Sequence, residues 1–416
     1  MNTVSDSLTR TKNFISEKLC CSAVSSVTSQ VLYLIVLACH LLHYQCKLIA
    51  WIRESHVVGD VGAMVFLDLA CYVTLLAIVY RFLLSHRGIW ILAAFAGTAL
   101  CLFLWPRMDY TWRCWAINLF LMIGARGKPY RRILMVYLAV FLAGLAVALI
   151  GLLTGYAFLQ DKKQSYGVGW ALGYIHANNA SRMFLWMAML SWLLFFRKRE
   201  WAMVLVFGIV ALASMFYMRC RTSAVMAVLI PASVLITNRW KPWRKWRPAT
   251  RRAAEGIVIA APFLCLLLSI LLSFVLMPLI PALRQSSLWN LLSRFIQNNI
   301  ALREYGVHLL GRGIDTFRSV WREFYGQAIA LSILDNAYVP WMIRHGLLLT
   351  VPVLGVLSAV LMRCLRLGDR PLLLAALFIL LYGMMEPASV QLHYNFTFLY
   401  LLALPDRQPA PGAIQP

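Results

Sequence analysis

The residues best suited to chemistry in this sequence are arginines at the ends of long apolar stretches. Arg219 and Arg221 separate two such stretches, and Arg294 and Arg312 lie in a longer, more polar segment that follows. A guanidinium matches a phosphate group bidentately and cannot lose its charge. We therefore expect Arg221, Arg294 and Arg312 to gather around one diphosphate. The alternative for Arg219 and Arg221 is that they simply extend from the membrane boundary into water.

Three titratable residues could move a proton near those arginines. Asp335 opens an apolar stretch, where its carboxylate would act either as a general base or as a helix N-cap. Burial would raise its pKa, whereas a nearby arginine would lower it. His176 precedes another apolar stretch and is either a base or a packed hydrogen-bonding residue. Glu386 lies at the end of a third stretch.

The elements that must position these groups are membrane helices. Hydrophobic residues make up 61% of the 416-residue chain, charged residues make up 13%, and the mean hydropathy is +0.72. A stretch of about 20 apolar residues is long enough to cross a bilayer. We predict an all-α, polytopic fold with about 12 spans, at 30–52, 62–84, 88–105, 110–124, 132–157, 180–196, 201–218, 221–237, 256–279, 337–362, 371–385 and 393–404.

The distribution of Lys and Arg predicts the orientation of these spans. Basic residues gather in alternate gaps between spans, for example in 126–132 and 239–252. Because cytoplasmic loops carry an excess of Lys and Arg, we predict that both termini are cytoplasmic. Basic loops that contact anionic membrane lipid then account for the net charge of +23, and no nucleic acid partner is expected.

Two of the predicted external segments are unusually long. They cover 158–180 and 280–336, within a single membrane domain predicted over 1–416. Long loops are usually functional or disordered, and the Leu, Trp and Phe content of the second loop argues against disorder. Its Leu288–Leu310 stretch has the spacing of a helix that lies along the membrane interface. We expect both loops to contribute to an active site.

Several kinds of chemistry have no supporting motif here. The sequence contains no Walker loop, HExxH, GxSxG or DxD pair. We therefore expect neither nucleotide hydrolysis nor a cofactor. The lack of an acidic pair also argues against a bound divalent metal.

Four local patterns, in this order, resemble those of the Wzy-type polysaccharide polymerases, which are related to the O-antigen ligases. They are Gly173-Tyr-Ile-His-Ala-Asn178, Arg221-Thr-Ser, Ser293-Arg294 with Leu310-Gly-Arg-Gly313, and Leu334-Asp-Asn-Ala-Tyr338. Glu386 and Tyr394-Asn395 fit the closing pattern of the family. The resemblance covers residues 170–400, and the first 150 residues match only as generic spans.

Two positions depart from the family pattern. Ligases carry a His-Asn pair where this chain has Asp335-Asn336, which favours a polymerase over a ligase and leaves the identity of the base open. The Arg-Gly of the family's arginine element is also altered here, to Arg221-Thr222.

The resemblance implies a metal-independent, GT-C-like membrane glycosyltransferase. Its donor would be a glycan on undecaprenyl diphosphate, and its acceptor a lipid-linked repeat unit whose hydroxyl attacks the anomeric carbon as the lipid diphosphate leaves. Asp335, His176 or Glu386 would handle the proton, and Arg221 and Arg294 would neutralise the leaving group. The other residues implied to bind the diphosphate or the glycan are Arg219, Arg312, Asn178, Asn336, Tyr338, Tyr394 and Asn395.

The resemblance also implies a location and partners. The chain would lie in the plasma (inner) membrane of a bacterium with its active site on the external or periplasmic face. A flippase and a chain-length regulator are the expected protein partners. A ligase that moves the glycan to another acceptor is one alternative, and a transporter or flippase for lipid-linked sugar is another. No half-to-half repeat is evident, and the polar groups gather at the outer edge, which argues against a transporter.

Overall fold

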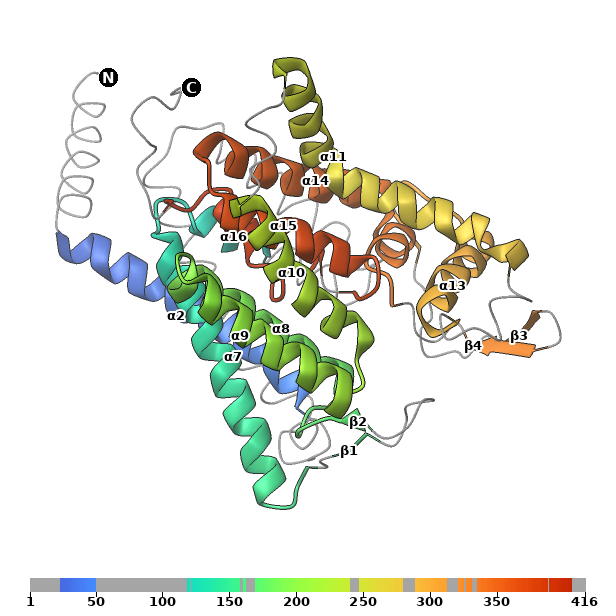
Figure 1. Ribbon diagram of the computed structural model, residues 1–416, viewed down its shortest axis with the longest axis horizontal. Helices are drawn as coiled ribbons and strands as arrows, with labels where there is room; N and C mark the ends of the chain where they lie inside the picture. The colour runs from blue at the N-terminus through green and yellow to red at the C-terminus, as the bar shows by residue number, and fades with distance from the viewer. Residues whose placement is uncertain are drawn as a thin grey trace, which may run out of the picture. The chain divides into compact units, whose positions relative to one another are not determined.

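The computed structural model describes eleven stretches of the chain, residues 23–49, 118–119, 121–157, 160–161, 169–239, 247–279, 289–312, 321–324, 327–330, 335–387 and 389–405. They form two compact units. The first contains the described residues from 23 to 157 together with 173–175 and 402–405, and the second contains 160–161, 169–172 and the described residues from 176 to 401. The described residues are mostly helical (Figure 1), which confirms the predicted helical class.

Among the described residues of the first unit, the helices α2 (Ala23–Leu48) and α7 (Tyr130–Leu153) pack against each other. The Tyr33 hydroxyl donates to the Leu121 carbonyl at 3.0 Å and is buried. At the start of α7, the Leu404 N–H donates to the Lys128 carbonyl at 2.8 Å. The end of the described chain therefore pairs with the turn before α7, a turn that the charge pattern predicts to be cytoplasmic.

The second unit contains the remaining elements, in chain order β1 (Gln160–Asp161), β2 (Gly169–Trp170), α8 (Ala177–Ser191), η3 (Trp192–Phe196), α9 (Glu200–Leu212), η4 (Ala213–Tyr217), α10 (Arg221–Arg239), α11 (Pro248–Val275), η6 (Met277–Leu279), α13 (Trp289–Tyr305), β3 (Trp321–Phe324), β4 (Gln327–Ala330), α14 (Tyr338–Leu367), α15 (Arg370–Gly383) and α16 (Thr397–Tyr400). The helices η3 and η4 are π-helical and η6 is a 3₁₀ turn. The strands pair as two antiparallel hairpins, β1–β2 and β3–β4, which add a minor β component to the helical fold.

Among the described residues, five segments are long and apolar enough to cross a membrane: α7, Glu200–Tyr217, α10, α11 and α14. Shorter apolar helices cover Gln30–Cys46 and Arg370–Gly383. These helices coincide with predicted spans, and α8 with η3 covers the span predicted at 180–196. The spans predicted at 62–84 and 88–105, and most of 110–124, lie outside the described residues. The total of 12 therefore stays a prediction.

The span predicted at 393–404 is not a membrane-spanning helix. Residues 389–405 form turns around the four-residue helix α16, and Phe396, Phe398 and Tyr400 are buried in protein. The Asn395 side chain supports this irregular backbone, because its Nδ2 donates to the Ser389 carbonyl at 2.5 Å. Non-helical backbone is tolerated at membrane depth where protein buries it. The apolar composition here reflects a protein interior, which hydropathy does not distinguish from a lipid-facing helix.

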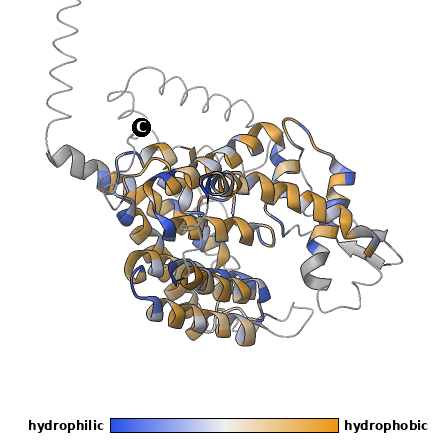
Figure 2. Cartoon of the chain, turned by 45° about the horizontal axis from the view of Figure 1, so that its top comes forward, coloured by the Kyte–Doolittle hydropathy of each residue, from blue (hydrophilic) through white to orange (hydrophobic). Residues whose placement is uncertain are grey.

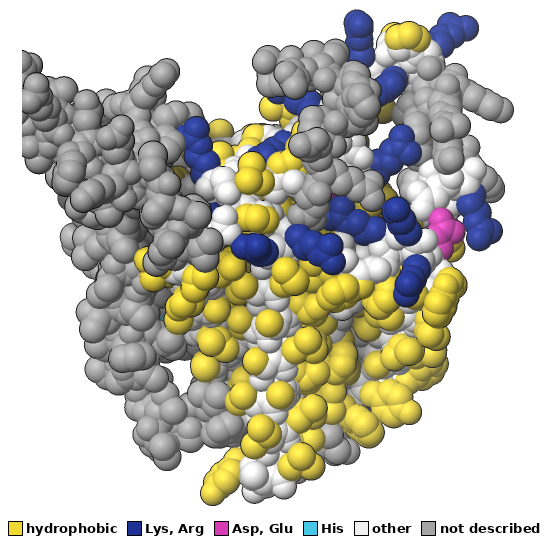
Figure 3. Space-filling view, turned by 90° about the vertical axis from the view of Figure 1, so that its left-hand side faces the viewer, with side chains coloured by type: hydrophobic (Ala, Val, Ile, Leu, Met, Phe, Trp, Pro, Cys, Tyr) yellow, Lys and Arg dark blue, Asp and Glu magenta, His cyan; other side chains and the backbone are white. Residues whose placement is uncertain are grey.

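The outer surfaces of the long helices are apolar. On α11, Leu267, Leu271 and Phe274 are each about half exposed, and hydrophobic residues dominate the helices in Figure 2. On the face drawn in Figure 3, Lys and Arg side chains gather beside a hydrophobic surface. An apolar surface this large is covered by lipid in a membrane protein and would not persist in water.

Within the second unit, α10 packs along α9, α11 packs along α14, and α13 packs on both α11 and α14. Buried hydroxyl groups help to fix these helices. The Ser181 hydroxyl of α8 donates to Ser214 of η4 at 2.7 Å, and the hydroxyls of Ser223 and Tyr382 lie 3.2 Å apart between α10 and α15. The helix α13, over Trp289–Tyr305, confirms that the Leu288–Leu310 stretch includes a helix, and its position at a membrane interface stays a prediction.

Helix α14 is interrupted at Gly346, where part of the long loop lies against it. Gly346 has φ 73° and ψ 175°, far from helical values. The N–H groups of Leu347 and Leu348 then donate to the carbonyls of His308 and Leu309, at 3.1 and 2.9 Å. The loop backbone thus supplies the partners that the broken helix lacks.

We expect Gly346→Ala to destabilise the protein strongly. This backbone conformation costs a residue with a side chain about 1–3 kcal/mol, and the new Cβ would also overlap the backbone nitrogen of Gly311. The measurement is the thermal unfolding midpoint in detergent. Gly355→Ala on the same helix is the matched control, because no atom lies within 4 Å of its Cβ and alanine favours the helix by about 1 kcal/mol. Equal midpoints for the two variants would contradict the account of the break.

Candidate functional site

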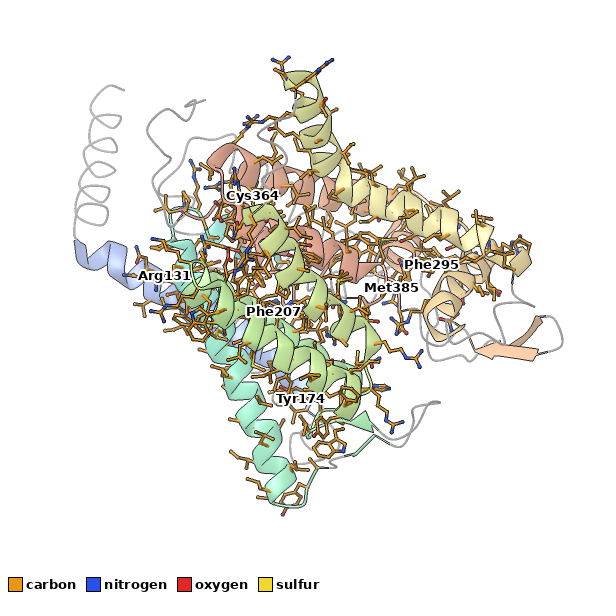
Figure 4. All side chains as sticks on the ribbon, in the orientation of Figure 1. Arg131, Tyr174, Phe207, Phe295, Cys364 and Met385 are labelled. Carbon is orange, nitrogen blue, oxygen red and sulfur yellow. The ribbon has the colours of Figure 1, made fainter. Side chains whose placement is uncertain are left out.

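Arg294 of α13 holds two carboxylates from other elements. Its Nε lies 3.2 Å from Asp335 Oδ2, and its Nη1 donates to Glu386 Oε1 at 3.0 Å. The same Nη1 also donates to the Met385 carbonyl. Met385 and Phe295, the chain neighbours of Glu386 and Arg294, are labelled in Figure 4. Three segments that are distant in sequence therefore meet at one guanidinium.

The two carboxylates differ in how accessible they are. The side chain of Asp335 is 30% exposed, whereas that of Glu386 is 6% exposed. Burial raises the pKa of Asp335 above its ordinary value, although Arg294 and, to a smaller extent, His176 and Arg182 act in the opposite direction. Asp335 is therefore the carboxylate that a substrate could reach, and its pKa is displaced toward the range useful for a general base.

Glu386 is held in a more enclosed position. Burial raises its pKa, Arg294 lowers it, and the neighbouring Asp335 charge raises it again. Burial disfavours the charge of Arg294, but the Glu386 and Asp335 carboxylates outweigh that effect and raise its pKa. Arg294 is thus a permanent cation whose ion pairs fix the direction of both carboxylates.

A second arginine, Arg182 on α8, lies in the same region and is buried. Its Nη2 donates to Asn179 Oδ1 at 2.6 Å and to the Tyr394 hydroxyl at 3.0 Å. The guanidinium also stacks 4.3 Å from the centroid of the Tyr394 ring, and Trp186 donates to the Tyr394 carbonyl. These contacts orient Arg182, while its Nε has no hydrogen-bond partner among the described residues.

We call Arg182, Arg294, Asp335 and Glu386, with Tyr394, the arginine–carboxylate cluster. The two cations and two anions balance, and each acts electrostatically on the others: Arg182 lowers the pKa of both Asp335 and Glu386. Buried charges persist in proteins when they are paired in this way. The cluster is therefore a stable polar site within an apolar protein.

The side chain that caps α14 is Asn336 and not Asp335. Its Oδ1 accepts the N–H groups of Tyr338 and Val339, at 2.8 and 3.0 Å, and its Nδ2 donates to Ser269 Oγ and to the Met384 carbonyl. The carboxylate of Asp335 is thereby left to pair with Arg294. The alternative in which Asp335 is a helix cap is therefore wrong. The contact of Asn336 with substrate stays a prediction, and the Asn336 amide already makes four hydrogen bonds within the protein.

His176 has the role of a helix cap in this structure. It is the N-cap of α8, and its Nδ1 accepts the Asn178 N–H at 3.3 Å. It also lies near enough to Asp335 to affect that carboxylate's pKa. The structure therefore supports the interpretation of His176 as a packed, hydrogen-bonding residue.

Arg219 and Arg221 flank a buried cysteine at the short turn between η4 and α10. Both arginines are exposed, and Arg219 has a left-handed backbone with φ 54°. Burial and then the Glu386 charge raise the pKa of the Cys220 thiol, so this turn lies near the arginine–carboxylate cluster. The structure thus brings the turn to the cluster, with the two guanidiniums on its exposed side.

The remaining predicted residues fall into two groups. Arg312 is exposed, and its N–H donates to the Ile343 carbonyl at 2.9 Å beside the break in α14. Tyr338 and Asn395 are buried and bond to the protein, Tyr338 through its hydroxyl to the Leu380 carbonyl at 2.7 Å and Asn395 as described above. Their positions indicate that Tyr338 and Asn395 support the fold of the site.

Arg182 is the main site residue that the sequence interpretation missed. A signal was present, because an arginine within an apolar span costs about 3 kcal/mol to insert and usually marks a functional position. This signal applies to Arg182, which lies within the span predicted at 180–196. Among the described residues, no group of three or more His, Cys, Asp and Glu is arranged to hold a metal ion. The expectation of a metal-independent site stays a prediction.

Comparisons with known proteins give no match. No family model matches the sequence, and neither a curated protein nor a solved structure is significantly similar to the chain. Function is therefore inferred from the geometry of the site and from the sequence patterns.

Proposed function

We propose that this chain is a membrane polysaccharide polymerase that joins oligosaccharide repeat units carried on undecaprenyl diphosphate. One observation carries the proposal: Asp335, an accessible carboxylate with a raised pKa, is held by Arg294 beside the buried cation Arg182. A base next to fixed cations is what glycosyl transfer from a lipid diphosphate requires. The fold would be GT-C-like, with the cluster on the external or periplasmic face of a bacterial plasma membrane.

In the proposed reaction a hydroxyl of the acceptor sugar attacks the anomeric carbon of the donor glycan. A new C–O bond forms as the bond from that carbon to the diphosphate oxygen breaks, and the lipid diphosphate leaves with the electron pair. The Asp335 carboxylate accepts the hydroxyl proton. Arg294 already binds both carboxylates, so its main role is to hold Asp335 in position.

The leaving diphosphate needs more positive charge than the cluster alone supplies. The two arginines of the cluster are balanced by Asp335 and Glu386, so no net charge is left over for an anion. The Nε of Arg182, which has no partner in the described part of the chain, offers one donor. The exposed Arg219 and Arg221, at the turn beside Glu386, would supply the additional charge.

The test is turnover by the purified full-length protein. We expect glycolipid extracted from source cells that lack this protein to be converted into a ladder of longer chains in nanodiscs, without nucleotide and in the presence of EDTA. A ligase would use the same groups but would add one glycan to a different acceptor, so it would give single-addition products. Failure to consume the glycolipid under any of these conditions would reject both. A chain-length regulator and a flippase remain the proposed protein partners.

The pH profile distinguishes Asp335 from His176 as the base. Turnover requires ionised Asp335, so activity should fall as the pH decreases through a pKa that lies above 3.8. His176 lowers that pKa, and Asn keeps the helix cap. We therefore expect His176→Asn to remain active, with the acidic limb of kcat/KM shifted to higher pH. Loss of activity at every pH would instead identify His176 as the base.

A further inference from the structure

Two adjacent asparagines on α13, Asn298 and Asn299, are fully buried without hydrogen-bond partners. Both residues have 0% exposure, and all four amide atoms lack a partner in the part of the chain that the structure describes. Leaving a buried polar atom unpaired costs about 1–3 kcal/mol. A pair of such residues in one place therefore needs an explanation.

Two other buried asparagines do find partners. The Asn336 amide makes four hydrogen bonds, and the Asn395 amide bonds to Ser389 and Thr397. In Asn298 and Asn299, by contrast, neither the oxygen nor the nitrogen of the amide has a partner among the described residues, which points to a ligand.

The position of Asn298 connects the pair to the arginine–carboxylate cluster. Asn298 follows Arg294 by four residues, so their Cβ atoms lie about 6 Å apart on one face of α13, and Asn299 follows on the adjacent side of the helix. One turn further along this face, Ala301 packs against Val339 and Ile343 of α14. Asn298 therefore lies between the ion pairs of Arg294 and the packed end of the helix.

The chemistry of the pair selects a class of ligand. Each carboxamide offers donors and an acceptor but no charge, which matches sugar hydroxyls, since these also donate and accept. A phosphate would call for cations and a divalent metal for carboxylates, and neither is supplied by Asn298 or Asn299. The neighbouring cluster already contains both kinds of charged group. A neutral sugar is the ligand that leaves no group at this place unpaired.

We propose that Asn298 and Asn299 form a subsite that binds sugar hydroxyls of the lipid-linked glycan next to Asp335. The proposal rests on the proposed polymerase function and extends it, because it assigns to α13 both a positioning residue, Arg294, and the sugar contacts. Both asparagines are covered by protein, so a sugar reaches them only when α13 shifts from its neighbours. Binding of the repeat unit and placement of Arg294 are thereby linked through one helix.

The test uses the full-length protein in nanodiscs and the repeat-unit oligosaccharide released from extracted glycolipid by mild acid. This probe lacks the lipid diphosphate, so its binding reports sugar contacts and does not depend on transfer. We expect Asn298→Leu and Asn299→Leu each to weaken oligosaccharide binding about three- to tenfold and to raise the KM for glycolipid similarly. Their unfolding midpoints should be unchanged or higher, because a leucine replaces an unpaired amide of similar size.

Two controls show whether those effects are specific. Ile300→Leu, on the same helix, should keep both binding and stability. Asn336→Leu should lower the unfolding midpoint, because it removes four hydrogen bonds. The subsite proposal is overturned if the Asn298 and Asn299 variants bind like the unchanged protein, if they lose stability as Asn336→Leu does, or if the unchanged protein binds no oligosaccharide. If oligosaccharide binding needs both asparagines but the protein does not extend the glycolipid into longer chains, the subsite proposal is supported and the polymerase function is rejected.

Discussion

An Asp335→Asn variant is expected to lose transfer activity by about 10²–10⁴-fold while it retains its fold. The amide has nearly the shape of the carboxylate but cannot accept the hydroxyl proton. Stability should change little, because Asp335 is partly exposed and Arg294 keeps its second ion pair with Glu386. The measurement is the initial rate of chain extension in nanodiscs, together with the unfolding midpoint of each protein.

The matched control is Asp369→Asn, at the other end of α14. Asp369 is also an acid in a salt bridge, 3.4 Å from Arg197, and its side chain caps α15 by accepting the Leu372 N–H. Asn retains that cap. We expect this variant to remain active. If Asp335→Asn retained turnover, Asp335 would not be the base. If it lost turnover, loss of a helix cap could not be the reason, because Asn336 and not Asp335 caps α14.

The helices were largely predictable because burial in lipid leaves a local signal. The spans predicted at 132–157 and 201–218 coincide closely with α7 and Glu200–Tyr217, since long apolar stretches have few alternatives to a helix in a bilayer. The segment 393–404 has the same apolar character but lies inside the protein as turns. Its structure depends on the neighbours that surround it, and these cannot be inferred from hydropathy.

The site was predictable only in part, for a related reason. The partial burial of Asp335 followed from its place at the end of an apolar stretch, and burial raises its pKa. The partners did not follow: Arg182 and Tyr394 are 212 residues apart, and Arg294 and Glu386 are 92 apart. The prediction that Arg294 binds a diphosphate assumed that its guanidinium is available, whereas in the structure it pairs with the carboxylates of Asp335 and Glu386. Pairing between distant residues is a tertiary property without a local sequence signal.

The second large effect expected is on stability, from Arg294→Met. Removing the guanidinium leaves Asp335 and Glu386 near each other in a mostly buried site without their main counter-charge, which typically costs about 3–5 kcal/mol. The unfolding free energy in mixed micelles measures it. Arg251→Met is the matched control, because Arg251 pairs with Glu255 at 2.9 Å on an exposed surface where such pairs contribute less than about 1 kcal/mol.

A second substitution separates the loss of charge balance from the loss of packing. If unpaired carboxylates cause the damage, Glu386→Gln in the Arg294→Met background should recover part of the stability, because it removes the more buried of the two negative charges. If lost packing is the cause, the two substitutions should add without recovery. Recovery of stability without recovery of transfer would then assign Arg294 to the reaction as a positioning residue, since the fold would have returned while Asp335 still lacked the group that directs it.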